Sequence, residues 1–198
     1  MNSELYLENW FPTTIGYSFC PFHNEIEEFL TSHCLQVKEQ VESGGKGWIS
    51  NKTYNTSDGK YDCIDDNKFD RLSKWVDSAV QEFAIANKIS PTIQLNSSWF
   101  NVYKKYDYQE FHKHPGSVIS TIYFLKADQN SSKVIFRTPN DDMFQIRYSE
   151  KTPASLRNVY FKPDPGKLII FLSNISHAVE RQETDANRIT ISYNFIQT

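Results

Sequence analysis

The stretch Arg188-Ile189-Thr190-Ile191-Ser192-Tyr193-Asn194-Phe195 alternates polar and apolar residues, which is typical of a β-strand with one buried face. Successive side chains of a strand point to opposite faces, so the first three polar residues share one face: Arg188, Thr190 and Ser192. An arginine inside a β-barrel needs an anionic partner, because an unpaired buried charge costs several kcal/mol. A carboxylate that accepts two hydrogen bonds from the guanidinium would meet this need.

Strand-like runs continue backward from this stretch to about residue 91, and the aromatic content of 15% favours strands as the main element. Turn clusters rich in Asn, Ser, Pro and Gly separate the runs, for example at residues 128–132 and 163–166. The six further predicted strands are Ile93–Tyr103, Ser117–Leu125, Lys133–Arg137, Met143–Tyr148, Asn158–Lys162 and Lys167–Leu172.

Helical periodicity is confined to the first ninety residues. The first predicted helix runs from Pro21 to about Gln40, with apolar residues three and four positions apart at Phe22, Ile26, Phe29 and Leu30. The second runs from Asn67 to about Lys88, and Pro91 ends it. Its apolar stripe comprises Phe69, Leu72, Trp75, Val76, Ala79, Val80, Phe83 and Ala84.

This order of elements predicts an α+β fold, an antiparallel jelly roll backed by N-terminal helices. At 198 residues we expect one domain, 1–198, with helical support over about 21–90 and a jelly-roll core over about 91–198. Residues 1–20 are expected to form a short extended segment against the core. The polar stretch from Gly44 to Asp66 is expected to be a loop over a site.

Composition excludes several functions. The formal charge is −3 and the basic residues are scattered, so nucleic acid is not expected as an obligatory partner. Neither a signal peptide nor a membrane-spanning run is evident, and we expect a cytosolic protein without a membrane partner. Cys20, Cys34 and Cys63 form no C-x-x-C pair and are expected to be buried thiols.

A candidate metal site lies in Glu110-Phe111-His112-Lys113-His114-Pro115. On a strand His112 and His114 would share a face with Glu110, which suits chelation. A third histidine, His177, follows the apolar strand that begins near residue 167. An alternative is that His114 only caps the Pro115–Gly116 turn. The histidines of the first helix, His23 and His33, are ten residues apart and share no chelating face, so we leave them out of the site.

Four stretches together resemble the iron(II)- and 2-oxoglutarate-dependent oxygenases, specifically the prolyl-hydroxylase-like branch with a His-x-His-Pro motif. They are Trp99-Phe100-Asn101-Val102-Tyr103, His112-Lys113-His114-Pro115, Ser120-Thr121-Ile122-Tyr123-Phe124-Leu125 and the run that begins at Arg188. The similarity covers about residues 95–198. It implies a double-stranded β-helix that holds Fe(II) through His112, His114 and His177. It also implies that Arg188 binds the far carboxylate of 2-oxoglutarate, with Thr190 or Tyr123 as hydrogen-bond donors.

Position 114 departs from the commoner family pattern, which has Asp or Glu there. Either the site is all-imidazole, or a nearby carboxylate such as Glu110 or Asp107 completes it. The resemblance implies hydroxylation of a small-molecule or peptide substrate, with decarboxylation of 2-oxoglutarate to succinate. Two alternatives stay open: a three-histidine, cupin-type dioxygenase without 2-oxoglutarate, and a metal-free jelly-roll binding module. The sequence identifies no substrate and leaves homodimer formation open.

Overall fold

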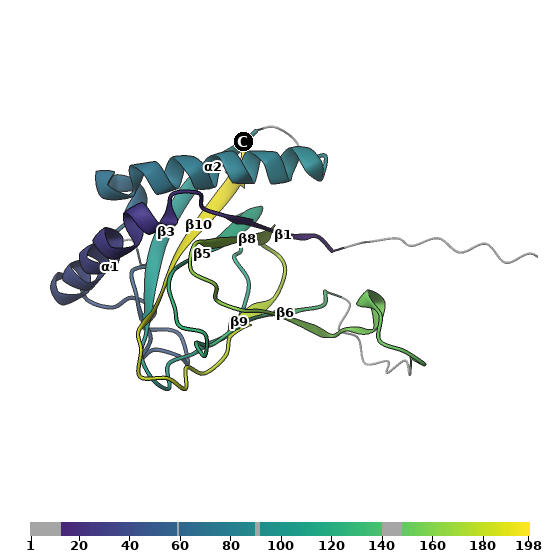
Figure 1. The fold of residues 1–198 in the computed structure, drawn as a ribbon. Coiled ribbons are helices and arrows are strands. Elements are labelled where there is room, and N and C mark those ends of the chain that lie inside the picture. The colour runs from purple at the N-terminus through teal and green to yellow at the C-terminus, as the bar shows by residue number, and fades with distance from the viewer. Residues whose placement is uncertain (1–12, 59, 90–91, 140–147) are drawn as a thin grey trace, which may run out of the picture.

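The computed structural model describes residues 13–58, 60–89, 92–139 and 148–198, which form two antiparallel sheets and two α-helices (Figure 1). The larger sheet has the strand order β1-β8-β5-β10-β3-β2 and the smaller one β4-β9-β6-β7. The larger sheet comprises β1 (Ile15–Phe19), β2 (Tyr54–Asn55), β3 (Ile93–Tyr103), β5 (Ile119–Lys126), β8 (Lys167–Leu172) and β10 (Arg188–Gln197). The smaller sheet comprises β4 (Gln109–His112), β6 (Val134–Arg137), β7 (Asn158–Phe161) and β9 (His177–Val179).

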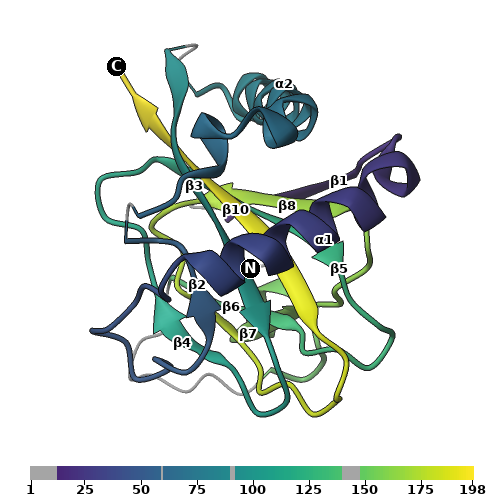
Figure 2. The ribbon, with the colours of Figure 1, turned by 90° about the vertical axis from the view of Figure 1, so that its left-hand side faces the viewer.

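Both helices cover the same face of the larger sheet. In Figure 2, α1 (His23–Gln40) crosses in front of β3 and β10, and α2 (Asp70–Ala86) lies beside it. The stripe of α2 packs into one buried cluster with sheet residues such as Phe100 and Ile191. Burial of this apolar surface is the main stabilising contribution, at roughly 25 cal/mol per Å².

The other face of the larger sheet is turned toward the smaller sheet. Phe124 and Phe171 from the larger sheet pack there against Val134 and Phe136 of β6 in a second buried cluster. The two layers leave a cavity between them at the end that holds β4 and β9. This arrangement is the predicted double-stranded β-helix.

β10 has the two-faced character that its alternation predicts. It lies between β3 and β5, where Ile189, Ile191 and Tyr193 belong to the cluster under the helices. Their polar neighbours line the cavity on the opposite face: Arg188, Thr190, Ser192 and Asn194. The strand order therefore places a row of polar side chains in the cavity between the two sheets.

The predicted strands that lie within the described residues are all present, with ends shifted by no more than two residues. The run Met143–Tyr148 falls almost wholly outside the described residues, as do Pro91 and the first twelve residues. β1 pairs with β8 at the edge of the larger sheet, so the extended segment predicted against the core is present from Ile15. The sequence reading missed β2, β4 and β9, which have two, four and three residues.

The first helix begins at His23, and one of its predicted core positions is wrong. Phe29 is 53% exposed, whereas Leu30 is buried. A helix turns by about 100° per residue, and the face of α1 that buries Leu30, Cys34 and Val37 leaves Phe29 on the solvent side. The second helix begins at Asp70 after a 3₁₀ turn, η2 (Asn67–Phe69).

The three cysteines are buried free thiols, as predicted. Among the described residues, no helix is both long enough and apolar enough to cross a membrane.

Candidate metal centre

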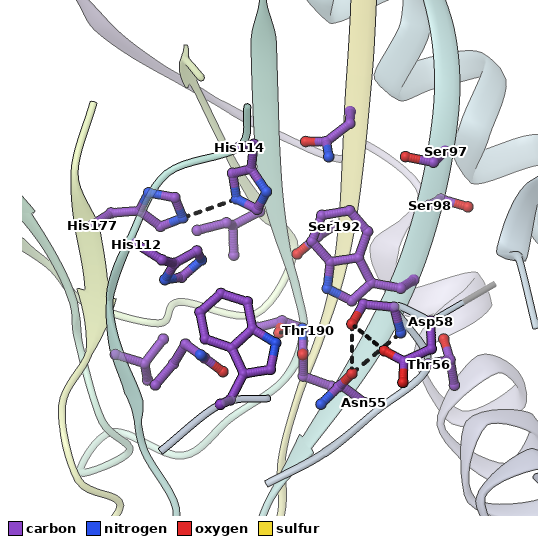
Figure 3. Close-up of a pocket in the computed structure, with 18 of the residues that line it drawn as sticks. Asn55, Thr56, Asp58, Ser97, Ser98, His112, His114, His177, Thr190 and Ser192 are labelled. Atoms are coloured by element: carbon purple, nitrogen blue, oxygen red, sulfur yellow. Dashed lines mark hydrogen bonds between the residues drawn. The ribbon is translucent and has the colours of Figure 1, made fainter. Parts of the chain in front are cut away.

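Three histidines from two parts of the chain meet at one end of the cavity (Figure 3). His112 ends β4 and His177 begins β9, and the two residues are partners in the antiparallel register. His114 lies two residues past the end of β4. The ligand atoms of all three lie within 4.8 Å of one another, and Nε2 of His114 is 3.2 Å from Nε2 of His177.

His114 is positioned by a turn, whereas the chelating spacing of His112 and His114 was argued for an extended strand. Its carbonyl accepts a hydrogen bond from the N–H of Ser117 (3.2 Å), and its own N–H donates to the carbonyl of Ser173 (3.1 Å). Pro115 and Gly116 occupy the middle of this turn, where Gly116 has φ +88°, as the third residue of a type II turn requires. The backbone of His114 thus forms the turn while its imidazole joins the cluster.

Backbone carbonyls set the tautomers of two of the imidazoles. Nδ1 of His112 lies 2.8 Å from the carbonyl oxygen of Glu110, and Nδ1 of His177 lies 3.0 Å from that of Ile175. A carbonyl oxygen only accepts, so each Nδ1 carries the hydrogen and each Nε2 keeps its lone pair. This is the orientation usual for histidines that bind a metal.

Burial keeps these imidazoles neutral at pH 7. It lowers the pKa of His112, and it lowers the pKa of His114 to about 4 with a smaller contribution from the repulsion of protonated His112. The pKa of His177 falls well below its usual value for the same reason. Neutral imidazoles bind first-row metals at about 2.0–2.1 Å, which puts adjacent ligand nitrogens roughly 3 Å apart. The observed 3.2 Å fits this requirement.

Neither carboxylate suggested as a substitute ligand belongs to the cluster. The carboxylate of Glu110 accepts hydrogen bonds from the N–H groups of Ile49 (2.7 Å) and Ser50 (3.2 Å) in the loop before β2. The carboxylate of Asp107 accepts one from the N–H of Lys104 (2.8 Å). Among the described residues, the group at this position that could hold a metal consists of histidines alone.

The same cavity contains a buried cation. Arg188 is fully buried, and none of its three side-chain nitrogens has a hydrogen-bond partner within the described part of the chain. Its guanidinium lies over the ring of Tyr103, 4.6 Å from the centroid. Burial lowers the pKa of Arg188, but a guanidinium stays charged in proteins. An anionic ligand would satisfy this group.

Thr190 is brought beside Arg188 as predicted, whereas Tyr123 is not. Thr190 lines the cavity, and its hydroxyl accepts a hydrogen bond from Nδ2 of Asn101 (3.3 Å). Tyr123 lies on the opposite face of β5, where its hydroxyl is 2.8 Å from Nδ1 of His23 under the helices. Ile122 is the β5 residue that lines the cavity. Tyr123 is thus removed from the predicted cosubstrate contacts.

The cavity measures about 450 Å³ and includes residues that the sequence reading did not single out. The loop from Gly44 to Asp66 lines part of the cavity, as predicted. Every second residue of β3 from Ser97 to Tyr103 also lines it. The most distinctive of these lining residues are Trp48, Asp58, Asp62, Trp99 and Asn101. The alternation along β3 could have identified Trp99 and Asn101, because both precede Tyr103 on one face.

The fold is a double-stranded β-helix, and its cavity contains a cluster of three histidines that could hold a metal ion. Residues 97–194 match the protein family described as "Putative 2OG-Fe(II) oxygenase". Over this region, which is just under half of the chain, the sequence is therefore similar to the 2-oxoglutarate- and Fe(II)-dependent oxygenases. No curated protein sequence matches the chain.

Solved structures agree on the fold at low sequence identity. A prolyl-4-hydroxylase from Pseudomonas putida is 11% identical with a TM-score of 0.63, and 94% of each chain is covered. A prolyl hydroxylase from Trichoplax adhaerens, in complex with a hypoxia inducible factor peptide fragment, is 14% identical with a TM-score of 0.66 over 92% of this chain and 83% of that one. HygX from Streptomyces hygroscopicus, with nickel, 2-oxoglutarate and hygromycin B bound, is 11% identical with a TM-score of 0.62 over 94% and 84%.

Proposed function

We propose that this protein uses Fe(II) and 2-oxoglutarate to hydroxylate a small-molecule or peptide substrate, with decarboxylation of 2-oxoglutarate to succinate. The observation that carries this proposal is the pairing of Arg188 with the histidine cluster in one cavity. A fully buried guanidinium without a partner is strongly unfavourable unless an anion binds to it. 2-Oxoglutarate supplies that anion at one end and a chelating group at the other.

His112, His114 and His177 would hold the iron through their Nε2 lone pairs. When bound, Fe(II) supplies the redox chemistry that activates dioxygen, while the protein supplies binding and orientation. Arg188 would bind the far carboxylate of 2-oxoglutarate through two parallel hydrogen bonds, and the hydroxyl of Thr190 would donate a third. Tyr103 and Phe124, whose rings lie against the guanidinium, exclude water from that ion pair.

Charge balance supports an anionic cosubstrate in an all-imidazole site. Three neutral imidazoles do not offset the two positive charges of Fe(II), and Arg188 adds a third positive charge to the cavity. The two carboxylates of 2-oxoglutarate offset most of this total. The all-imidazole ligand set is also the feature that favours the second candidate, a cupin-type dioxygenase without 2-oxoglutarate. That candidate leaves the guanidinium of Arg188 without a function.

The test is direct binding and turnover of 2-oxoglutarate. Protein loaded anaerobically with Fe(II) is titrated with 2-oxoglutarate by calorimetry, and succinate is then measured after oxygen is admitted. We expect saturable binding and slow succinate formation even without substrate. Iron-loaded protein that does not bind 2-oxoglutarate would contradict the proposal, and the cupin-type reading would replace it. If the protein retains neither iron nor zinc or nickel in its place, the metal-free binding module would be the remaining candidate function.

A further inference from the structure

Two of the three histidines each contact an indole ring. The ring centroids of Trp48 and His112 are 5.0 Å apart, and those of Trp99 and His114 are 5.4 Å apart. His177 instead packs against Phe171 of the core, with ring centroids 4.7 Å apart. The side of the cluster away from the core is therefore flanked by two tryptophans, one from the loop before β2 and one from β3.

A carboxylate lies next to the indole of Trp48, and a second carboxylate is bound by the residue before Trp99. Gly45, at φ +71°, packs so closely on Trp48 that a Cβ there would lie 2.6 Å from Cδ1 of the indole. The N–H of Gly45 donates to Oδ1 of Asp58 (2.8 Å), which fixes this carboxylate beside the indole. On the other side, Ser98 precedes Trp99 and donates to Oδ1 of Asp62 through its hydroxyl (2.6 Å) and its N–H (3.1 Å).

Both carboxylates line the cavity that contains the histidines. Figure 3 shows Asp58 across the pocket from the three histidines, near Asn55 and Thr56. Asp58 is exposed and Asp62 is half-buried, whereas Arg188 is fully buried, so the carboxylates lie at the open end and the guanidinium at the closed end. The remaining charged residue of the lining, Lys113, is exposed.

The chemistry of the open end matches a positively charged group. The faces of indole rings attract cations, and a nearby carboxylate adds a counter-charge. Aliphatic side chains are sparse in this cavity, where Ile122 and Val179 are the branched aliphatic residues that line it, so a purely apolar substrate would find little matching surface. Other groups that line the cavity are hydroxyls and amides, among them Asn55, Ser57 and Ser97.

We propose that the substrate carries an ammonium or guanidinium group that binds between Trp48 and Trp99, with Asp58 as its counter-charge. This inference rests on the proposed function, because it assigns the open end to the substrate and the closed end to 2-oxoglutarate. The cation would hold a neighbouring C–H bond of the substrate beside His112 and His114. The basic side chain of a peptide, a polyamine and an aminosugar all offer such a group.

The experiment compares charged probes with neutral ones of similar shape. Protein loaded with Zn(II), a redox-inert substitute for iron, is titrated with and without 2-oxoglutarate while the indole N–H signals are followed by NMR. The probe pairs are Gly-Lys-Gly with Gly-norleucine-Gly, spermidine with 1,8-octanediol, and glucosamine with glucose. Signals are assigned from Trp48→Phe and Trp99→Phe variants. The pair with the largest difference in affinity identifies the source of the cation.

We expect at least one cationic probe to shift the signals of Trp48 and Trp99, and its neutral partner to bind more weakly. Asp58→Asn is expected to weaken binding by about fivefold, the upper range for an exposed ion pair. Glu28→Gln removes the same charge from the exposed side of α1 and should have no effect. Trp48→Leu is expected to weaken binding by about three- to thirtyfold.

Equal affinity for charged and neutral probes, or an unchanged affinity in Asp58→Asn, would overturn the inference. The proposed function is judged separately by the binding of 2-oxoglutarate to the same sample. If 2-oxoglutarate binds and no cation does, only the substrate assignment fails. If cations bind and 2-oxoglutarate does not, only the cosubstrate assignment fails.

Discussion

Nε2 of His114 lies 3.2 Å from Nε2 of His177, although 63 residues separate these histidines in the sequence. The carbonyl of Ile175 engages Nδ1 of His177, so the Nε2 lone pair of His177 points at His114. A metal ion between the two nitrogens would use both lone pairs at once. The first prediction therefore concerns His114, where the commoner family pattern has a carboxylate.

His114→Ala is expected to weaken Fe(II) or Zn(II) binding by more than the roughly 10–100-fold that loss of an outer-sphere partner costs. His114→Asp should retain the metal, because it restores two histidines and a carboxylate. Metal affinity is measured by competition with a chelating dye. Lys113→Ala, at the exposed neighbouring position, is the matched control and should bind metal normally. Normal metal affinity in His114→Ala would reduce His114 to a turn residue.

Arg188→Met is expected to abolish the stabilisation of the protein by 2-oxoglutarate. A ligand that binds only the folded state stabilises the protein more as the ligand concentration rises. Loss of one partner of a buried charged pair weakens binding by about 2–5 kcal/mol. Without 2-oxoglutarate the same variant should be as stable as the wild type or more so, because an unpaired buried charge is removed. Thermal unfolding with and without 2-oxoglutarate measures both effects. Equal thermal shifts in variant and wild type would exclude Arg188 as the anion site.

Glu110→Ala is expected to release the loop that carries Trp48 while the metal affinity stays unchanged. The carboxylate of Glu110 accepts the N–H groups of Ile49 and Ser50 and lies outside the histidine cluster. Loss of these hydrogen bonds should lower the free energy of local opening by about 1.4 kcal/mol. Amide hydrogen exchange at Ile49 and Ser50 should therefore become roughly tenfold faster. Loss of metal affinity in Glu110→Ala would instead identify Glu110 as a ligand.

Tyr123→Phe is expected to leave 2-oxoglutarate affinity unchanged and to cost about 1 kcal/mol of stability. The hydroxyl of Tyr123 meets Nδ1 of His23 under the helices, on the face of β5 away from the cavity. Removal of one partner of a buried hydrogen bond has about this effect. Urea unfolding measures the stability, and calorimetry the affinity. Weaker 2-oxoglutarate binding in this variant would show that Tyr123 acts on the cavity after all.

Stability of the metal-free protein is expected to fall as the pH decreases from about 7 to 5. Burial lowers the pKa of His23, His112, His114 and His177, with that of His114 at about 4. In the unfolded chain these groups bind protons near pH 6.5, so below that pH the unfolded state binds more protons than the folded one. The contribution of these histidines to the free energy of unfolding is thus fully present above pH 6.5, and it is lost progressively toward pH 4. Thermal unfolding of chelator-treated protein should show a decrease of several degrees over this window.

His114→Asn is the control for this pH dependence. It removes one titrating group from the cluster, so the decrease between pH 7 and 5 should be shallower than in the wild type. A transition temperature that stays constant or rises as the pH falls would contradict the assignment of buried neutral imidazoles.

The sequence by itself determined the two helices and the longer strands, because side-chain periodicity is a local property of the chain. The alternation from Arg188 to Phe195 placed Arg188 and Thr190 on one face, and the structure has them on the cavity side. The spacing of His112 and His114, together with the resemblance in the same region, singled out the three histidines that the structure brings together. Their role as metal ligands stays a prediction.

Tertiary structure decided which face of each strand meets the cavity and which loop reaches the site. Tyr123 and Ile122 are adjacent on a fully buried strand, so nothing in their hydrophobicity says which one faces the helices. β4 and β9 are too short to show a period, yet their pairing aligns His112 with His177. The carboxylate of Glu110 accepts hydrogen bonds from two N–H groups about sixty residues earlier in the chain. The ring of Trp48 contacts that of His112 at a similar separation in sequence. Such contacts depend on the packing of distant segments, which no local pattern of residues specifies.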